Sequence, residues 1–222
     1  MIILKNLNKE LNGNAVLTDI NLELSKGKVY GLQGKNGSGK TMLMRAVCGL
    51  IKPNGGYVEI DGKCLGKESA FPESVGCLIE NPAFVPYYSG LKNLQILADI
   101  KGRIGRKDIC LMMERVGLDP GEKKPFRKYS LGMKQRLGIA CAFMEEPDII
   151  LLDEPFNALD TEGVEMLKNL LGEAKEKEAT IIVACHDKEE LELIADEIFV
   201  MENGKIMEQK IRKEGTCYEG IS

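Results

Sequence analysis

One glycine-rich segment constrains the fold of this 222-residue chain more than any other: Gly34-Lys35-Asn36-Gly37-Ser38-Gly39-Lys40-Thr41. It follows a strand-like run at 28–33 and opens an apolar helical run at 42–47, so it joins a strand to a helix. Its glycines let backbone N–H groups turn toward one point at no steric cost, and the positive end of the helix dipole faces the same point. The segment therefore predicts a phosphate-binding loop within an α/β fold.

The residues of this loop have distinct expected roles toward a nucleoside triphosphate. Lys40 is expected to reach the β- and γ-phosphates, and the Thr41 hydroxyl is expected to bind Mg²⁺. The alternative is a glycine-rich turn with a chance lysine, which the strand–loop–helix context disfavours. The other residues expected to surround the phosphates are Gly34, Asn36, Gly37, Ser38 and Gly39.

Short strands are predicted toward both ends of the chain. The runs Ile149–Leu152 and Thr180–Ala184 are continuously apolar, as expected for parallel strands that are covered on both faces. Asp61-Gly62 and Asn203-Gly204 are turn pairs between strand-like runs, so each predicts a hairpin. The remaining predicted strands are Ile2–Leu7, Asn21–Leu24, Lys28–Gln33, Tyr57–Ile60, Lys63–Leu65, Glu197–Glu202 and Lys205–Gln209.

Helical patterns dominate the middle of the chain, and alternation of strand and helix resumes after it. This order predicts the α/β class: a P-loop NTPase core with a mostly parallel sheet, an antiparallel β subdomain and an inserted helical subdomain. We expect residues 1–222 to form one domain. Its core would comprise 1–80 and 146–222, and residues 81–145 would form the helical subdomain.

Two adjacent carboxylates, Asp153 and Glu154, directly follow the apolar run at 149–152. A carboxylate at the end of a strand beside a phosphate loop can bind Mg²⁺ through water, and its neighbour can polarise an attacking water molecule. His186 is the only histidine of the chain and follows the second buried run. A lone histidine is more often structural, but the carboxyl end of a parallel strand is where open α/β sheets bind their ligands.

A further candidate is Ser130, which precedes an apolar helical run that starts at Leu131. Serine is a good N-cap residue, and a helix start of this kind can bind an anion. By itself this signal is weak, because most such starts are caps and nothing more.

Composition narrows the function classes. A net charge of −4 with an isoelectric point near 5.3 gives no sign of nucleic-acid binding. Seven cysteines without a CxxC spacing indicate neither a zinc site nor a disulfide framework, which favours a reducing cytosol. No run approaches the roughly 20 apolar residues that cross a bilayer, so any membrane role would require docking to another protein.

In combination and order, these motifs resemble the ABC ATPase family across essentially the whole chain. The glycine-rich loop is similar to Walker A, and Asp153-Glu154 is similar to Walker B with its catalytic glutamate. Tyr129-Ser130-Leu131-Gly132-Met133 is similar to the signature motif, usually LSGGQ. Asn157-Ala158-Leu159-Asp160 is similar to the D-loop, and His186 to the switch histidine.

This resemblance implies ATP and Mg²⁺ as cofactors and a head-to-tail sandwich of two subunits around two ATP molecules. The dimer would be a homodimer or a heterodimer with a related cassette. Glu154 would be the general base, and His186 would hold the γ-phosphate. Ser130 and Gly132 are implied to serve the partner's nucleotide, and Asp160 of the D-loop is implied to be a nucleotide-binding residue. The implied Mg²⁺ ligands are Thr41, Asp153 and Glu80.

The chain departs from the family pattern at three places. Glu80 stands where the Q-loop usually has glutamine, and we assign it a catalytic and metal-binding role. Its carboxylate adds a negative charge near the γ-phosphate, which would alter hydrolysis. Leu11 replaces the aromatic residue that stacks on adenine, so Leu11 and Val16 are expected to contact the nucleotide by aliphatic packing. The signature has Leu131 and Met133 for glycine and glutamine. A Glu-type Q-loop with such a signature is similar to ATPases of bacterial peptide-antibiotic and lantibiotic export or immunity.

The resemblance implies a transporter ATPase that works with a separate transmembrane permease, in the cytoplasm on the inner face of the membrane. The apolar segment 82–88 either receives the permease or packs inside the helical subdomain. A soluble ABC ATPase of translation or DNA repair is the alternative, although such relatives usually carry tandem cassettes or long coiled-coil inserts. A P-loop kinase would leave the signature, D-loop and His186 unexplained. No nucleic-acid partner is expected.

Overall fold

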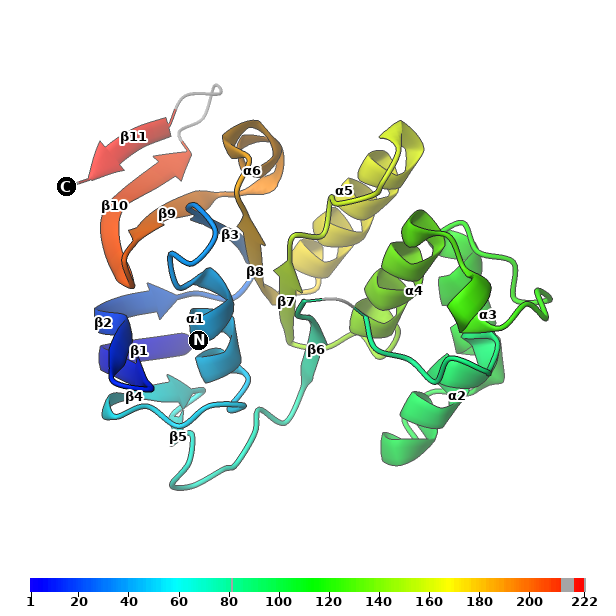
Figure 1. Cartoon of the computed structure of the whole chain (residues 1–222), viewed down its shortest axis with the longest axis horizontal. Coiled ribbons are helices and arrows are strands. Elements are labelled where there is room, and N and C mark those ends of the chain that lie inside the picture. The colour runs from blue at the N-terminus through cyan, green and yellow to red at the C-terminus, as the bar shows by residue number, and fades with distance from the viewer. Residues whose placement is uncertain (81, 213–217, 222) are drawn as a thin grey trace.

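Two β-sheets and a lobe of helices make up the computed structural model, which describes residues 1–80, 82–212 and the backbone of 218–221 (Figure 1). Residue 81, the expected first residue of the helical subdomain, and Cys217 lie outside the described residues. The smaller sheet is antiparallel and has the order β2-β1-β4-β5. Its strands are β1 (Ile2–Leu11), β2 (Asn14–Leu24), β4 (Gly55–Ile60) and β5 (Lys63–Cys64).

The larger sheet has seven strands in the order β11-β10-β9-β3-β8-β7-β6. The five strands from β9 to β6 are parallel, and β10 and β11 continue the sheet antiparallel. The predicted α/β class with a mostly parallel sheet is therefore confirmed. The strands are β3 (Lys28–Gln33), β6 (Val75–Leu78), β7 (Ile149–Asp153), β8 (Thr180–Cys185), β9 (Glu197–Glu202), β10 (Lys205–Arg212) and β11 (Tyr218–Ile221).

The first hairpin is longer than the sequence predicted. β1 runs to Leu11 and β2 begins at Asn14, because the two strands pair across a tight turn at Asn12 and Gly13. Both turn residues have positive φ, 51° and 79°, as a two-residue hairpin turn requires. The predicted ends at Leu7 and Asn21 were wrong because the Asn-Gly signal at the turn was not used.

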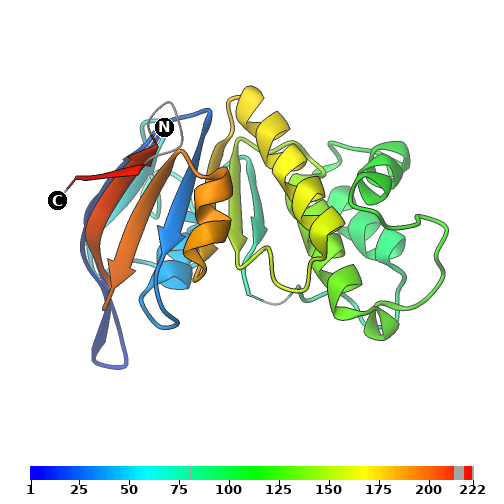
Figure 2. The same ribbon diagram turned by 90° about the horizontal axis from the view of Figure 1, so that it is seen from above.

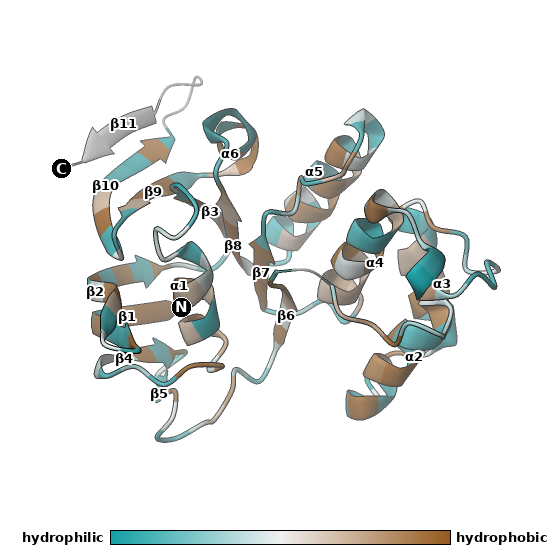
Figure 3. Cartoon of the chain, viewed as in Figure 1, coloured by the Kyte–Doolittle hydropathy of each residue, from teal (hydrophilic) through white to brown (hydrophobic). Residues whose placement is uncertain are grey.

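The parallel strands separate two hydrophobic cores. Along β7, Ile150 and Leu152 face one core, whereas Ile149 and Leu151 face the other. Figure 3 shows these central strands as hydrophobic along their length. This pattern confirms the expectation that the apolar run was a strand covered on both faces.

Helices occupy both sides of the large sheet and form the lobe beside it (Figure 2). α1 (Lys40–Val47) shares a core with the small sheet, and α5 (Thr161–Glu176) and α6 (Lys188–Ile194) share a core with the opposite face. The short, charged α6 was not predicted. The lobe contains α2 (Gly90–Lys101), α3 (Arg106–Arg115), the 3-10 helix η1 (Phe126–Lys128) and α4 (Leu131–Phe143). Among the described residues, no helix has both the length and the apolar character that a bilayer span requires.

The lobe contacts the core closely where α4 crosses the edge strand β6. A Cβ atom on Gly76 would lie 1.8 Å from the carbonyl oxygen of Ala142, so only glycine fits at this crossing. Backbone sets this approach, and a side-chain rotation cannot relieve it.

We therefore expect Gly76→Ala to lower the free energy of unfolding by roughly 3 kcal/mol, because α4 or β6 must shift. Gly172→Ala is the matched control, since no atom lies within 4 Å of the added Cβ and the residue is in helix α5. That change should stabilise the protein by up to about 1 kcal/mol. Urea denaturation measures both, and equal midpoints for the two variants would contradict this account of the crossing.

Candidate functional site

The phosphate loop lies between β3 and α1, as the sequence predicted. Gly37 and Gly39 have φ of 81° and 106°, a region that side chains disfavour. A Cβ atom on Gly34 would lie 2.5 Å from both the Met201 carbonyl oxygen and Ser38 Oγ. The loop borders a cavity of about 540 Å³ that is also lined by His186 and the β9–β10 turn.

Lys40 is the cation of this loop, and its side chain is only 6% exposed. Its ammonium group donates hydrogen bonds to the carbonyl oxygens of Gly34 at 2.6 Å and Lys35 at 3.3 Å. The same nitrogen lies 4.0 Å from Glu154 Oε1. A buried positive charge is thus positioned between the loop and the catalytic carboxylate candidate.

Thr41 and Asp153 form a direct link between α1 and the end of β7. The Thr41 hydroxyl donates a hydrogen bond of 2.7 Å to Asp153 Oδ2. Burial raises the pKa of the Asp153 carboxyl, and the hydrogen bonds from Thr41 and the Glu80 backbone N–H act in the opposite direction. A hydroxyl beside a carboxylate supplies the hard oxygen ligands that Mg²⁺ prefers.

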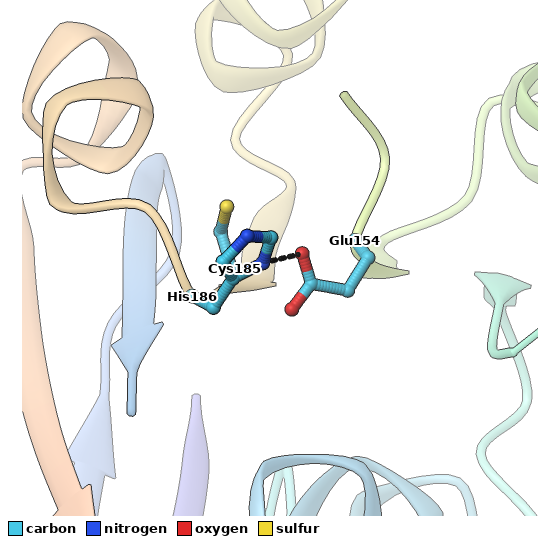
Figure 4. Close-up of side chains that lie close together, drawn as sticks. All are labelled: Glu154, Cys185 and His186. Atoms are coloured by element: carbon cyan, nitrogen blue, oxygen red, sulfur yellow. Dashed lines mark hydrogen bonds and ion pairs between the residues drawn. The ribbon is translucent and has the colours of Figure 1, made fainter. Parts of the chain in front are cut away.

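Glu154 and His186 pair across the ends of β7 and β8. His186 Nδ1 donates to Glu154 Oε2 at 2.8 Å, and Figure 4 shows this contact. Glu154 has a φ of 49°, and its backbone N–H donates to the Ala184 carbonyl oxygen at 2.8 Å. This arrangement directs the carboxylate toward Lys40 and the imidazole.

Buried oxygens without partners test whether the site suits a nucleotide. Among the described residues, Ser38 Oγ and Glu154 Oε1 are buried and make no hydrogen bond. Buried polar atoms are normally satisfied, so oxygens of this kind indicate positions built for a ligand or for water. The donors and oxygens of the site therefore fit a phosphate chain with Mg²⁺.

Cys185 lies beside this pair but has a different environment. Its sulfur, a Glu154 oxygen and a His186 nitrogen all lie within 4.8 Å of one another (Figure 4). However, the thiol donates to Glu190 Oε2 at 2.9 Å, and burial raises its pKa, so it stays protonated. A metal binds the thiolate form of cysteine, and we interpret Cys185 as a packing residue. Sequence reasoning did not single it out.

Glu80 lies two residues beyond the end of β6, and its side chain is paired with α1. Arg45 donates to Glu80 Oε1 at 2.7 Å, and the Glu80 side chain is 59% exposed. The extra negative charge expected from the sequence is therefore compensated within the chain. Arg45 follows Thr41 by one helical turn, and no pattern in the sequence indicated that it would face Glu80.

The signature residues and Asp160 stand at helix starts. Ser130 caps α4, and its hydroxyl accepts the Met133 N–H at 3.2 Å. Asp160 caps α5 by accepting the Gly163 N–H, which together with Arg136 keeps the pKa of the Asp160 carboxyl low. Figure 1 shows α4 in the helical lobe, on the far side of β7 and β8 from α1.

The two residues expected near the base lie on the first hairpin. Leu11 ends β1 and is exposed, and Val16 is half-buried on β2. The Val16 carbonyl oxygen would be 2.9 Å from a Cβ atom on Gly39, so β2 passes directly beside the phosphate loop. The structure thus brings the loop together with Asp153, Glu154 and His186 and places the first hairpin next to it. Within the part of the chain that the structure describes, Ser130, Gly132 and Asp160 make no hydrogen bond or ion pair with the phosphate loop.

Known proteins share this combination of motifs and fold. The sequence profile of the ABC transporter family matches residues 17–157. The chain belongs to the ABC transporter family. It is an ATP-binding subunit of such a transporter, and it is an ATPase. The resemblance to the ABC ATPases stated from the sequence is confirmed.

Individual relatives agree with this assignment. An uncharacterised ABC transporter ATP-binding protein of Bacillus subtilis, YybJ, is 45% identical over 93% of this chain and 94% of its own length. The bacitracin transport ATP-binding protein BcrA of Enterococcus faecalis is 41% identical over 92% of this chain and 67% of its own length. The ATP-binding cassette MJ0796, solved as a dimer bound to ADP and Pi, shares the fold with a TM-score of 0.86. It is 23% identical, over 96% of this chain and 100% of that one.

The Arg45–Glu80 pair predicts that these two charges are coupled when this ABC subunit binds ATP. Arg45→Ala leaves the Glu80 carboxylate uncompensated beside the phosphate site, so the KM for Mg-ATP should rise. Because exposed ion pairs contribute up to about 1 kcal/mol, we expect a rise of about fivefold. The double variant Arg45→Ala/Glu80→Gln should restore the wild-type KM in steady-state ATPase assays. An equal KM for the single and double variants would show that the two charges act separately.

Proposed function

We propose that this ATP-binding subunit dimerises around ATP and powers the export of a peptide antibiotic or similar amphiphile through a separate membrane permease. The observation that carries the ATPase part is the meeting of Lys40, the Thr41–Asp153 bond and the Glu154–His186 pair at one edge of the sheet. In this position the chain would work in the cytoplasm, peripherally on the inner face of the membrane. The helical subdomain at 81–145 would carry the signature.

Within the bound nucleotide site, each residue has a proposed task. Lys40 neutralises the β- and γ-phosphates, and backbone N–H groups of the loop donate to phosphate oxygens. Glu154 takes a proton from the attacking water, and His186 both orients that carboxylate and contacts the γ-phosphate. Thr41, Asp153 and Glu80 would hold Mg²⁺, which supplies electrostatic stabilisation of the phosphates. Leu11 and Val16 pack against the base.

The proposed dimer is supported by residues that lie apart from the phosphate loop of their own chain. Ser130 and Gly132 lie at the start of α4, and Asp160 lies at the start of α5. A serine-capped helix start is suited to bind an anion, and a second subunit supplies one when its ATP lies against α4. The dimeric state of the MJ0796 cassette supports this arrangement. The second subunit would be a copy of this chain or a related cassette.

The cargo proposal rests on one relative, BcrA, which is a bacitracin transport ATP-binding protein. The Glu-type Q-loop and altered signature support the same branch. A soluble role in translation or DNA repair is disfavoured, because the relatives named are transport proteins or transporter subunits.

The segment at 82–88 is the proposed permease contact. Phe84 packs edge-on against Phe126 with 5.1 Å between the ring centroids, so part of the segment is anchored in the lobe. Tyr87 is 71% exposed, and the Arg127 guanidinium carbon lies over its ring, 5.1 Å from the ring centroid. An exposed aromatic residue on an anchored loop is suited to contact an apolar helix of a partner.

Glu154→Gln tests the proposed base and the dimer together. Glutamine preserves the shape of the side chain and cannot accept the proton from water, so kcat should fall by about 100-fold or more. ATP should then remain bound and hold two subunits together. Size-exclusion chromatography with Mg-ATP should give a dimer for this variant and a monomer without nucleotide. A monomer at saturating Mg-ATP would count against the sandwich.

Transport is tested with the permease itself. Co-expression with a candidate multi-span protein should give a complex that survives purification, and added bacitracin should raise its ATPase rate. Cells that carry this complex should tolerate more of the peptide than cells with Lys40→Ala in place of the wild-type subunit, because that variant lacks the phosphate-binding cation. Equal tolerance in the two strains, or no complex with any neighbouring multi-span protein, would overturn the export proposal.

A further inference from the structure

Three residues on one face of α4 contact the segment that follows the catalytic strand β7. Gly132, Gln135 and Arg136 are spaced three and four positions apart, so they lie along one side of the helix. Each of the three contacts residues 154–160, the stretch from the catalytic Glu154 to the cap of α5. Ser130 caps α4, so one rigid helix joins the signature to this stretch.

Gln135 makes the contact nearest the chemistry. Its amide Nε2 donates to the carbonyl oxygens of Glu154 at 3.2 Å and Pro155 at 3.0 Å. These are main-chain contacts to Glu154 itself and to the next residue, and they leave the Glu154 carboxylate free for His186 and Lys40. The side chain of Gln135 therefore acts on the backbone that aims the carboxylate.

That backbone needs an external constraint. Glu154 and Ala158 have φ of 49° and 64°, and a left-handed conformation costs a residue with a side chain about 1 kcal/mol or more. Gly132 lies directly against the second of these residues, because a Cβ atom there would be 2.9 Å from the Ala158 carbonyl oxygen. Two of the three α4 contacts thus fall on the two strained positions.

Arg136 extends the contact to the far end of the stretch. Its guanidinium donates to Asp160 Oδ1 at 2.7 Å and to the Val116 carbonyl oxygen at 2.8 Å, and the side chain is 16% exposed. Gly117 makes room for it, since a Cβ atom there would lie 2.7 Å from Arg136 Nη1. The arginine is therefore anchored within the lobe while it contacts the core.

We propose that Gln135, assisted by Arg136, is a positioning residue that holds the main chain of Glu154 in a fixed position relative to the start of α4. The inference rests on the proposed function, in which Glu154 is the base and the start of α4 serves the ATP of the partner subunit. When the partner's ATP displaces α4, the Glu154 carboxylate beside the subunit's own ATP therefore moves with it. Over the described residues, neither side chain makes a hydrogen bond or ion pair with the phosphate loop of its own subunit.

A competing explanation is that these contacts only fasten the lobe to the core, and the chain offers a matched comparison. Arg115 of α3 also joins lobe to core, through a 2.6 Å ion pair with Glu173 near the end of α5. This pair has the same chemistry as Arg136–Asp160 and involves no residue of the 154–160 stretch. If these contacts only attach the lobe to the core, removing either the Arg115 contact or the α4 contacts should change kcat to a similar extent.

The experiment measures ATPase kinetics and thermal midpoints for Gln135→Met, Gln135→Lys and Arg115→Met. Gln135→Met keeps the length of the side chain and removes both donors, so kcat should fall by roughly tenfold or more, with the KM for ATP within about twofold of wild type. Gln135→Lys keeps N–H donors within reach and should recover a clear part of that loss. Arg115→Met should keep kcat within about twofold of wild type, even where its thermal midpoint drops.

Several outcomes would overturn the proposal: an unchanged kcat in Gln135→Met, an equal kcat loss in Arg115→Met, or a lysine variant no better than methionine. If Gln135→Met is too unstable to assay, Arg136→Met is compared with Arg115→Met on the same criteria. Wild type and Glu154→Gln are assayed alongside. An ATPase rate that Glu154→Gln leaves unchanged would refute the proposed base, whereas a normal Glu154→Gln result with an active Gln135→Met refutes only the positioning role.

Discussion

The parallel register of β3, β8 and β7 is the constraint on which the site depends. Ala184 pairs with Leu32 on one side and with Asp153 on the other, so the three strands end at the same height. The residues just beyond these ends are the phosphate loop, Glu154 and His186. Main-chain hydrogen bonds set this alignment, and they allow no slip without turning each side chain to the opposite face. The site is therefore assembled by the sheet, and the loops complete it.

Charge balance follows from this assembly. Asp153 and Glu154 are neighbouring carboxylates, and Lys40 is the buried cation between them and the loop. Burial disfavours the charged form of Asp153, and hydrogen bonds from Thr41 and the Glu80 backbone offset part of that cost. The fourth charge, on Glu80, is compensated by Arg45 outside this cluster. The surplus of carboxylates over cations suits a divalent metal ion beside the phosphates.

Two contacts of α4 in the helical lobe with the core differ in kind. At Gly76 the backbones of β6 and α4 approach so closely that the crossing point is fixed. Near residues 154–160, the side chains of Gln135 and Arg136 contribute hydrogen bonds and an ion pair, beside the close approach of Gly132 to Ala158. Hydrogen bonds of this kind can be exchanged for others at a small net free energy, unlike a steric contact. A pivot near β6 with adjustable contacts near Glu154 is consistent with a lobe that responds to nucleotide.

The sequence by itself determined the phosphate loop, the two apolar strands at 149–152 and 180–184 and the carboxylates and histidine that follow them. These features are local, because each signal depends on residues that are adjacent in the chain: the glycines of the loop, the continuous apolar runs and the spacing of the motifs. The predicted hairpin at 197–209 was also local, and β10 extends it to Arg212. The role of each site residue stays a prediction, since it concerns a bound nucleotide.

Only the tertiary structure decided which distant residues meet. Arg45 with Glu80, Gln135 with the Glu154 backbone, and Arg136 with Asp160 are each separated by 19 or more positions in the chain. An exposed arginine and an exposed glutamate are frequent in any sequence, so neither identifies its partner. Their pairing arises because the sheet order and the β6–α4 crossing place α1, α4 and the end of β7 around one point, and that placement is a property of the packed chain.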